Sequence, residues 1–205
     1  MRIFTNWHKY WKNRKIDWDK SYTATWDHPH RELIIEVLKQ FDWHTLWEVG
    51  CASGPNLVKI AKSLAGKQLG GSDINPEAID EARKLFKNAP FEVSPADNIL
   101  LSDKSCDVIL TDVTLIYAPP WKIKKVLKEF KRIVRNRVVL VEFDSTKWYR
   151  RLWLRLTTGY SAYNYQKLLE EAGFYDIIKY RIPSKYYPGV SKVHDEFATL
   201  IWAKV

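Results

Sequence analysis

Short apolar runs and longer segments of helical period alternate along most of the chain. The apolar runs have the length of β-strands, and we expect seven of them, at residues 45–50, 67–73, 91–94, 106–112, 137–143, 174–183 and 194–205. Segments with apolar residues three and four apart predict helices. They cover residues 31–40, 55–65, 76–86, 121–135 and 163–172. Strands that alternate with helices in this way are typical of βαβ units with right-handed crossovers, so we expect a mostly parallel sheet.

The two ends of the chain depart from this pattern. A short amphipathic helix is expected near Trp7 and Trp11, and residues 145–162 form a basic and aromatic insertion. The last two apolar runs are separated by residues 184–192, which contain proline and glycine, so we expect them to pair as an antiparallel edge. A chain of 205 residues is long enough for one domain and too short for two ordinary ones.

The charge of the chain is unevenly distributed. Its net charge is +9, but residues 1–20 carry six Lys/Arg and two acids, and residues 121–155 carry twelve Lys/Arg and three acids. These two segments contribute +13 together, which leaves the rest of the chain at −4. The ten Trp and eleven Tyr lie largely near the ends of the chain. A local basic excess suits an anionic substrate, a nucleic acid or a lipid surface, and it is also compatible with a solvated helix face.

Cysteine content and hydropathy exclude several classes of protein. Cys51 and Cys106 lack the spacing of a zinc site and are too few for a disulfide framework, so we expect no metal. The first residues lack the apolar core of a signal peptide, and no apolar run is long enough to span a membrane. We therefore expect a cytoplasmic protein.

A glycine-containing turn follows the first predicted strand. Glu48 ends the strand, and the small residues from Gly50 to Gly54 lead directly into a helix. A turn of this kind lets a ligand approach the backbone, because glycine has no Cβ. Turns like it occur in many α/β proteins, but this chain also places the acids Asp73, Asp97 and Asp112 at or after later strand ends. Ligands bind at that edge of open α/β sheets, and a carboxylate there can accept from both hydroxyls of a ribose.

Together these motifs resemble those of class I S-adenosylmethionine-dependent methyltransferases. The resemblance covers residues 31–205. It rests on the sequences EVGCASG at 48–54, DIN at 73–75, PADN at 95–98, DVILTD at 107–112 and LKEFKRIV at 127–134. Ala52 stands where many members have glycine, and its methyl group is small enough for the turn.

The resemblance implies a fold and a division of the chain. The fold is a three-layer α/β/α, Rossmann-like seven-stranded sheet, mostly parallel with an antiparallel last strand. Residues 1–205 then form a single methyltransferase domain. Within it, residues 1–44 are an aromatic and basic lid with a lead-in helix, residues 45–144 the cofactor-binding half, and residues 145–205 the acceptor-side half with its cap insertion.

The resemblance also implies the cofactor, S-adenosyl-L-methionine, with S-adenosyl-L-homocysteine as product. The implied cofactor-binding residues are Glu48, Gly50, Cys51, Ala52, Ser53, Gly54, Asp73, Ile74, Ala96, Asp97, Asn98, Asp112 and Val113. In the family's arrangement the glycine turn contacts the methionine part and Glu48 helps hold its amino group. Asp73 binds the ribose, the residues from Ala96 to Asn98 together with Ile74 contact the adenine, and Asp112 and Val113 line the floor near the sulfonium.

The sequence defines the methyl acceptor less closely than it defines the cofactor. His28, His30, His194 and Tyr117 are candidates for a general base, and none of them stands out. The sequence after Asp112 lacks the prolines typical of exocyclic-amine methylation of bases, and neither cysteine lies in a context for cytosine C5 methylation.

We therefore expect a small or medium organic acceptor, anionic or aromatic, with the acceptor atom (O, N or C) left open. The expected lid contains Trp7, Trp11, Tyr22 and Trp26, facing a cap at residues 148–165. Three alternatives remain: an RNA methyltransferase that uses the basic segments, a non-catalytic cofactor-binding or interaction module, and peripheral docking on an anionic lipid surface. The sequence indicates no oligomeric state.

Overall fold

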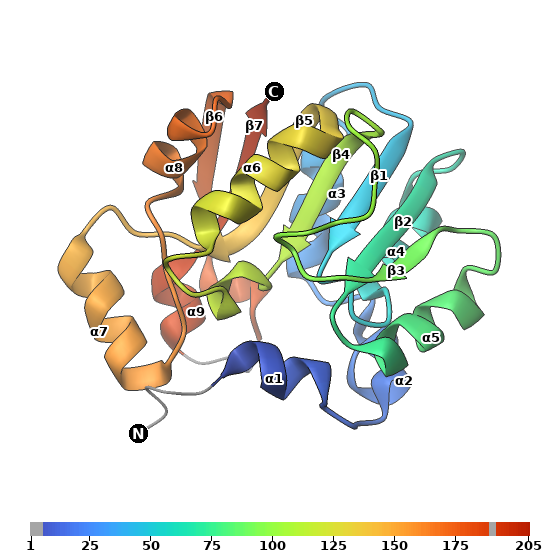
Figure 1. The fold of residues 1–205 in the computed structure, drawn as a ribbon, viewed down its shortest axis with the longest axis horizontal. Helices are drawn as coiled ribbons and strands as arrows, with labels where there is room; N and C mark the ends of the chain where they lie inside the picture. Colours follow the sequence, from blue (N-terminus) through green and yellow to red (C-terminus); the bar gives the residue numbers. More distant parts are fainter. Residues whose placement is uncertain (1–5, 189–191) are drawn as a thin grey trace.

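The seven predicted strands form one mixed sheet in a computed structural model, which describes residues 6–188 and 192–205 (Figure 1). The strands are β1 Thr45–Val49, β2 Gln68–Asp73, β3 Phe91–Val93, β4 Cys106–Asp112, β5 Val134–Phe143, β6 Tyr175–Arg181 and β7 Ala198–Lys204. Their order across the sheet is β3-β2-β1-β4-β5-β7-β6. Strand β7 is antiparallel to both of its neighbours, and the pairs among β1 to β5 are parallel. The predicted fold class is therefore confirmed.

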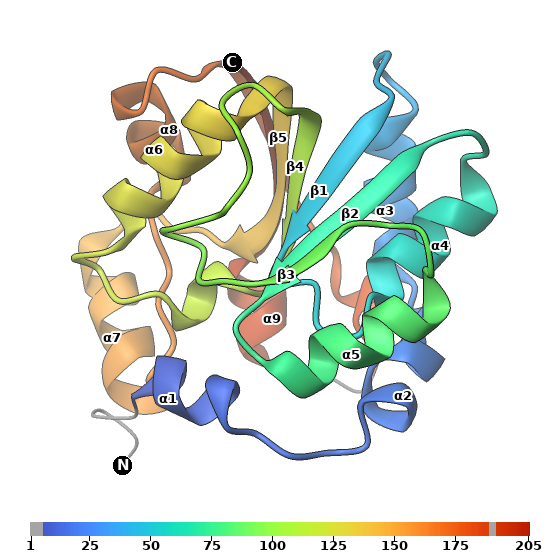
Figure 2. The ribbon, with the colours of Figure 1, turned by 45° about the vertical axis from the view of Figure 1, so that its right-hand side comes forward.

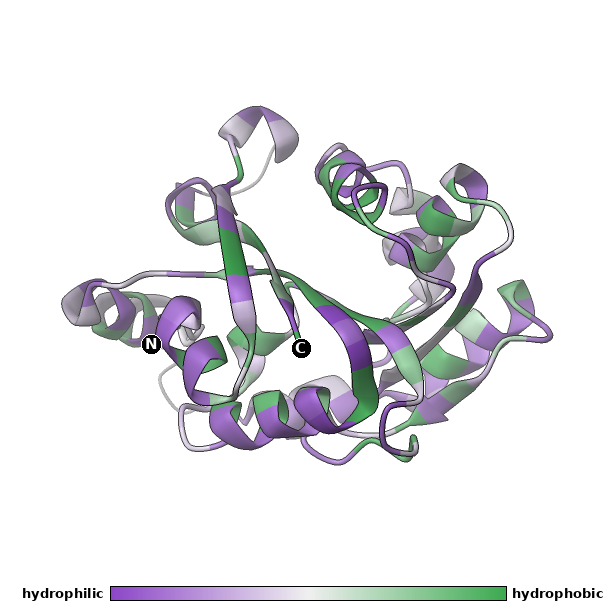
Figure 3. Cartoon of the chain, turned by 90° about the horizontal axis from the view of Figure 1, so that it is seen from above, coloured by the Kyte–Doolittle hydropathy of each residue, from purple (hydrophilic) through white to green (hydrophobic). Residues whose placement is uncertain are grey.

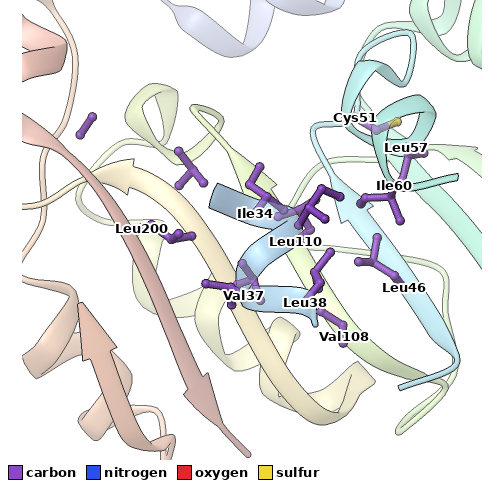
Figure 4. Packing of buried hydrophobic residues seen from close by; sticks show 14 of the residues in the cluster. Ile34, Val37, Leu38, Leu46, Cys51, Leu57, Ile60, Val108, Leu110 and Leu200 are labelled. Carbon is purple, nitrogen blue, oxygen red and sulfur yellow. The ribbon is translucent and has the colours of Figure 1, made fainter. Parts of the chain in front are cut away.

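Helices cover both faces of this sheet and complete the three layers. The helices are α1 Trp7–Lys12, α2 Trp18–Ser21, α3 His30–Leu38, α4 Pro55–Ser63, α5 Pro76–Leu85, α6 Ile123–Ile133, α7 Trp148–Thr158, α8 Tyr165–Glu171 and α9 Lys192–Phe197, with 3₁₀ turns at Thr23–Thr25, Leu115–Tyr117 and Ser184–Tyr186. Side chains of α3, α4 and α5 pack on one face, where α3 lies against β1 and β4 (Figure 4). Those of α6 and α8 pack on the other face. Most helices are striped with hydrophilic and hydrophobic residues, as expected for elements with one buried side (Figure 3).

Local sequence signals set several element boundaries. Asn75 caps α5 by accepting from the backbone N–H of Ala78 at 3.1 Å, and Pro76 occupies the first helical position. Gly54 precedes α4 with a φ of 88°, and Gly173 follows α8 with a φ of 85°, a conformation that glycine adopts without strain.

Two predictions about element boundaries were wrong. Val134 begins β5 and does not extend the preceding helix, because a β-branched residue with extended backbone pairs there with Cys106 of β4. Residues 192–197 form α9, so the last strand begins at Ala198 and not at His194.

The N-terminal segment lies across the carboxyl-terminal edge of the sheet, where α1 and α2 pass beneath the ends of the strands (Figures 1 and 2). Asn75 holds it by donating from Nδ2 to the backbone carbonyls of Trp11 and Arg14, at 2.7 and 2.8 Å. Ser53 donates from Oγ to the carbonyl of Trp18 at 3.1 Å. Residues of the first two strand-end turns therefore fix the segment that closes this edge.

Replacing Gly70 with alanine should destabilise the fold by about 1–3 kcal/mol, because a Cβ there would lie 2.7 Å from both the Pro90 carbonyl oxygen and the Trp47 ring. Chemical denaturation would measure the loss. Gln68→Ala, at the exposed start of the same strand, serves as the control and should be close to wild type. A free energy of unfolding for Gly70→Ala within about 0.5 kcal/mol of wild type would contradict this packing.

Candidate active site

A cavity of about 860 Å³ opens at the carboxyl ends of β1, β2 and β4. The turns after these strands form its inner wall, and residues of α1 and α2 cover it from the N-terminal segment. This volume falls within the usual range for sites that bind small molecules. Ten of the thirteen predicted cofactor-binding residues line it: Glu48, Gly50, Cys51, Ala52, Asp73, Ile74, Ala96, Asp97, Asp112 and Val113.

The other three predicted residues do not line the cavity. Ser53 is fully buried and its Oγ accepts from Thr23 Oγ1 at 2.9 Å, so it joins the turn to the N-terminal segment. Gly54 is the residue before α4 and supplies the left-handed backbone on which that helix begins. Asn98 is exposed in the turn after β3, where its backbone N–H donates to the carbonyl of Pro95 at 3.0 Å.

Close backbone contacts shape the glycine turn after β1. The backbone N–H groups of Gly50 and Cys51 both donate to the carbonyl of Ser72, at 2.7 and 3.0 Å. Gly50 has a φ of 75°, and a Cβ at this position would lie 2.2 Å from Oγ1 of Thr114. The turn can therefore pack this closely against Thr114 only because Gly50 has no Cβ. Ala52 stands where related turns often have glycine. Its φ of 49° shows that the backbone is left-handed at this position.

Asp73 fixes this turn from the end of β2. Its Oδ2 accepts from the backbone N–H of Ala52 at 3.0 Å, and its Oδ1 accepts from that of Asn75 at 2.9 Å. Burial raises the pKa of Asp73, and these backbone donors lower it in part. The carboxylate thus supports two turns and also lines the cavity.

A buried hydrogen-bonded network connects the acids of β1 and β4. Asn56 Nδ2 donates to Glu48 Oε1 at 2.6 Å and to Asp112 Oδ2 at 3.1 Å, and its own Oδ1 accepts from Arg31 Nε at 2.6 Å. The second oxygens, Glu48 Oε2 and Asp112 Oδ1, have no hydrogen-bond partner among the described residues. Two buried carboxyl oxygens on the cavity wall are therefore left for a ligand.

The two acids of this network have opposite pKa shifts. Burial raises the pKa of Glu48 to about 8, and the hydrogen bond from Asn56 offsets this only in part. Burial would also raise the pKa of Asp112, but the nearby His30 outweighs it and brings the pKa to about 2. Near pH 7, Glu48 is therefore mostly protonated and Asp112 is ionised.

The histidine pair His28 and His30 adjoins Asp112. His30 Nε2 lies 2.7 Å from Asp112 Oδ2, and His30 Nδ1 lies 2.6 Å from His28 Nδ1. Burial and the neighbouring His30 lower the pKa of His28 to about 4. His30 lines the cavity, whereas His194 packs against Phe143 on the other side of Tyr187 and is not part of the wall.

Asp97 carries two ion pairs at the outer part of the cavity. Its Oδ2 lies 3.1 Å from Lys122 Nζ and 3.4 Å from Lys125 Nζ. Burial alone would raise the pKa of Asp97, but the two lysines outweigh it and lower the pKa. This carboxylate is therefore ionised near neutral pH and already partly neutralised by α6.

Aromatic side chains form the outer wall. The Tyr117 ring lies 5.1 Å from the rings of both Trp7 and Trp11, measured between centroids. Tyr22 also lines the cavity, which places three of the four predicted lid residues there. Trp26 lies elsewhere, with Lys62 Nζ 3.6 Å from the centre of its ring.

Sequence reasoning missed Asn56 and Arg31, which join the two acids. Both lie in the first turn of a helix, and a polar residue at such a position is usually interpreted as exposed. Both are buried here, because α3 and α4 begin at the edge where the cavity opens. Arg155 from α7 and Ser161 were also missed as cavity residues, and both belong to residues 145–162.

Two further predictions concern features outside the cavity wall. Cys51 and Cys106 are both buried free cysteines. No cluster of metal-ligating side chains occurs within residues 6–188 and 192–205. In the same part of the chain, we find no helix that is both long and apolar enough to span a membrane.

The sheet order, the glycine turn after β1 and the acidic ends of β2 and β4 agree with the resemblance to class I S-adenosylmethionine-dependent methyltransferases. Residues 47–137 match the family model described as a methyltransferase domain. The matched segment runs from β1 into β5, which supports the resemblance of the chain to class I S-adenosylmethionine-dependent methyltransferases. No curated protein matches the chain in sequence.

Solved structures with the same fold include enzymes with different substrates. The geranyl diphosphate C-methyltransferase of Streptomyces coelicolor superposes with a TM-score of 0.68 at 14% identity, over 87% of this chain and 79% of that one. A putative methyltransferase of Haloferax volcanii, solved in complex with a methyltransferase activator, gives 0.67 at 16% identity, over 92% and 96%. Magnesium protoporphyrin IX methyltransferase of Synechocystis, with bound SAH, gives 0.64 at 15% identity, over 97% and 92%. At these identities the likeness establishes the fold and leaves the acceptor undefined.

Proposed function

We propose that the cavity binds S-adenosyl-L-methionine and that the protein transfers its methyl group to a small or medium organic acceptor. The observation that carries this proposal is the pair of unpartnered buried oxygens, Glu48 Oε2 and Asp112 Oδ1, beside the glycine turn. Buried acceptors without a partner are costly unless a ligand provides a donor. A cofactor with a cationic amino group and a cationic sulfonium suits this acidic wall.

The remaining wall residues fit the other parts of the cofactor. The turn from Gly50 to Ala52 is small enough for the methionine portion, and Asp73 offers a carboxylate to the ribose hydroxyls. Ile74 and Ala96 provide apolar contact for adenine, and Asp97 can accept from its amino group. When bound, S-adenosylmethionine supplies an electrophilic methyl group, so the protein's main task is to align the acceptor with it.

Aromatic and cationic side chains of the outer wall favour an aromatic or anionic acceptor. Trp7, Trp11 and Tyr117 offer ring faces and edges, and Arg155 and Lys122 offer positive charge on the same cavity. The lid of residues 1–44 and the cap of residues 145–162 would then select the acceptor, as the division of the chain predicts.

We assign no general base. Both ring nitrogens of His30 are already hydrogen-bonded, one to Asp112 and one to His28. Burial raises the pKa of Tyr117 well above its usual range, which makes its phenolate unfavourable. An acceptor carboxylate or free amine needs no base, and the site as built suits such an acceptor.

An assay with methyl-labelled cofactor tests the acceptor class. The protein is incubated with a cell extract and the labelled cofactor, and label is expected in small soluble products. The variant Asp73→Ala should transfer much less label, which controls for other methyltransferases in the extract. Label found only in RNA would overturn this proposal, as would cofactor binding without transfer to any component.

The interactions of the basic segment favour the small-molecule acceptor over RNA. Arg150 is paired with Glu196 at 2.8 Å. Arg151 donates to two backbone carbonyls before α7. Arginines that are held in this way are poorly placed for phosphate contacts.

A further inference from the structure

Helix α7 presents an apolar stripe to solvent. Trp148, Leu152 and Leu156 are spaced four apart and therefore lie in one row, with Tyr149 and Trp153 in the adjacent row. Each of these five side chains is between 46 and 67% exposed, whereas Leu154, on the other side of the helix, is fully buried. An ordinary surface helix turns its apolar face inward. A contiguous exposed patch of large apolar residues usually marks an interaction site.

The arginines of α7 fix this orientation. Arg150 forms an ion pair with Glu196 of α9, and its guanidinium carbon lies 4.9 Å from the centre of the Phe197 ring. Arg151 donates to backbone carbonyls at the start of the helix, and Arg155 donates to Ser161 Oγ. The charged side chains therefore bind the helix to the body of the protein and leave the tryptophans and leucines outside.

The charge around the stripe indicates its partner. Residues 145–169 contain five Lys/Arg and no Asp or Glu, and so do residues 1–16. Helices α1 and α7, which belong to these segments, are neighbours in space, since Trp7 Nε1 donates to the carbonyl of Gly159 at 2.9 Å and α1 lies beside α7 (Figure 1). A second copy of this chain would bring like charges together, because the whole chain carries +9. A negatively charged surface with an apolar layer beneath it complements both features.

We propose that α7 docks on an anionic lipid surface. Its tryptophan and tyrosine rings are amphipathic and suit the headgroup region, and the leucines between them suit the acyl boundary. Lys147 is exposed at the start of the helix, and Lys9 and Lys12 are exposed on α1. These cations would attract the surface before the apolar stripe inserts. Because α7 also supplies Arg155 to the cavity wall, docking would bring the site close to the lipid surface.

Vesicle co-sedimentation of the full chain tests this proposal. Vesicles of phosphatidylcholine mixed with phosphatidylglycerol should bind the protein, and vesicles of phosphatidylcholine alone should bind it much less. Replacing both Trp148 and Trp153 with alanine should lower the partition coefficient about tenfold or more, because two large interfacial side chains are lost. High salt should weaken binding of the wild-type protein to the mixed vesicles.

Replacing Tyr175 and Tyr180 with alanine provides a matched control, since it removes two similarly exposed aromatic rings from β6. This variant should bind mixed vesicles as the wild type does. Equal losses in the two variants would overturn the proposal, as would absence of binding to mixed vesicles. Self-association that depends on Trp148 and Trp153, without vesicle binding, would assign the stripe to a second copy. Cofactor affinity, measured separately, should be unchanged in both variants, so this result is independent of the proposed function.

Discussion

Replacing Asp73 with alanine is expected to weaken binding of S-adenosylhomocysteine by about 2 kcal/mol or more, which is about thirtyfold in Kd. In the proposed complex the carboxylate accepts from the ribose hydroxyls, and charge-assisted hydrogen bonds of this kind are the strong ones. The same side chain accepts from the backbone N–H groups of Ala52 and Asn75, so its loss also loosens the glycine turn. Isothermal calorimetry would measure the affinity.

Asp107 supplies the control for the structural part of this effect. It lies at the start of β4, at the opposite end of the sheet from the cavity. Its Oδ2 accepts from the backbone N–H groups of His44 and Thr45, both at 2.9 Å, much as Asp73 caps its own turns. Asp107→Ala should therefore lower the free energy of unfolding but leave cofactor affinity within about twofold. Wild-type affinity in Asp73→Ala, or an equal loss of affinity in Asp107→Ala, would place the ribose elsewhere.

Cofactor binding at pH 7 is expected to release about one proton from Glu48. Burial raises the pKa of this carboxyl to about 8, so in the free protein it is mostly protonated at pH 7. A cationic amino group at Glu48 Oε2 favours the ionised form, and the proton must then leave. Calorimetry in buffers of different ionisation enthalpy would give the number of protons released on binding. Affinity should also rise as the pH is raised towards 8.

Glu142 is the matched control, because burial raises its pKa to about 8 as well. Its Oε1 accepts from the backbone N–H groups of Thr114 and Leu115, and it does not belong to the cavity wall. Glu142→Gln should keep the proton release, and Glu48→Gln should lose it. Heats that do not depend on the buffer, or proton release that persists in Glu48→Gln, would show that Glu48 does not meet the cofactor.

The same two carboxyls affect the stability of the cofactor-free protein. Each has an ordinary pKa of 4.5 and a raised pKa of about 8 in the folded state. Between these values the folded protein binds more protons than the unfolded chain, so stability should fall as the pH rises through this range. Asp112 acts in the opposite sense, because its pKa is lowered to about 2 and its stabilisation is lost only in strong acid.

The sheet and the cavity edge could be predicted because they depend on regular patterns. Apolar runs define the strands, and the carboxyl ends of parallel strands meet at one edge, so Glu48, Asp73 and Asp112 had to lie near one another. The network through Asn56 and Arg31 could not be predicted in this way. It depends on the angle at which α3 and α4 meet the sheet, and a helical period does not report that angle.

The insertion shows a second limit of periodicity. The apolar residues of α7 repeat at helical spacing, and such a stripe normally predicts a buried face. Here the arginines pack inward and the stripe faces solvent, because Arg150 forms an ion pair with Glu196 and Arg155 donates a hydrogen bond to Ser161 Oγ. Which face of α7 is buried therefore depends on partners outside the helix. Glu196 of α9 is distant along the chain, and Ser161 belongs to the connection between α7 and α8.

A crystal structure of the protein with S-adenosylhomocysteine tests the central claim most directly. We predict density in the cavity at the carboxyl ends of β1, β2 and β4, with the ribose hydroxyls on Asp73 and the amino group at Glu48 Oε2. Density at another place on the protein would contradict the assignment of this cavity, as would a cofactor whose amino group and ribose avoid both acids.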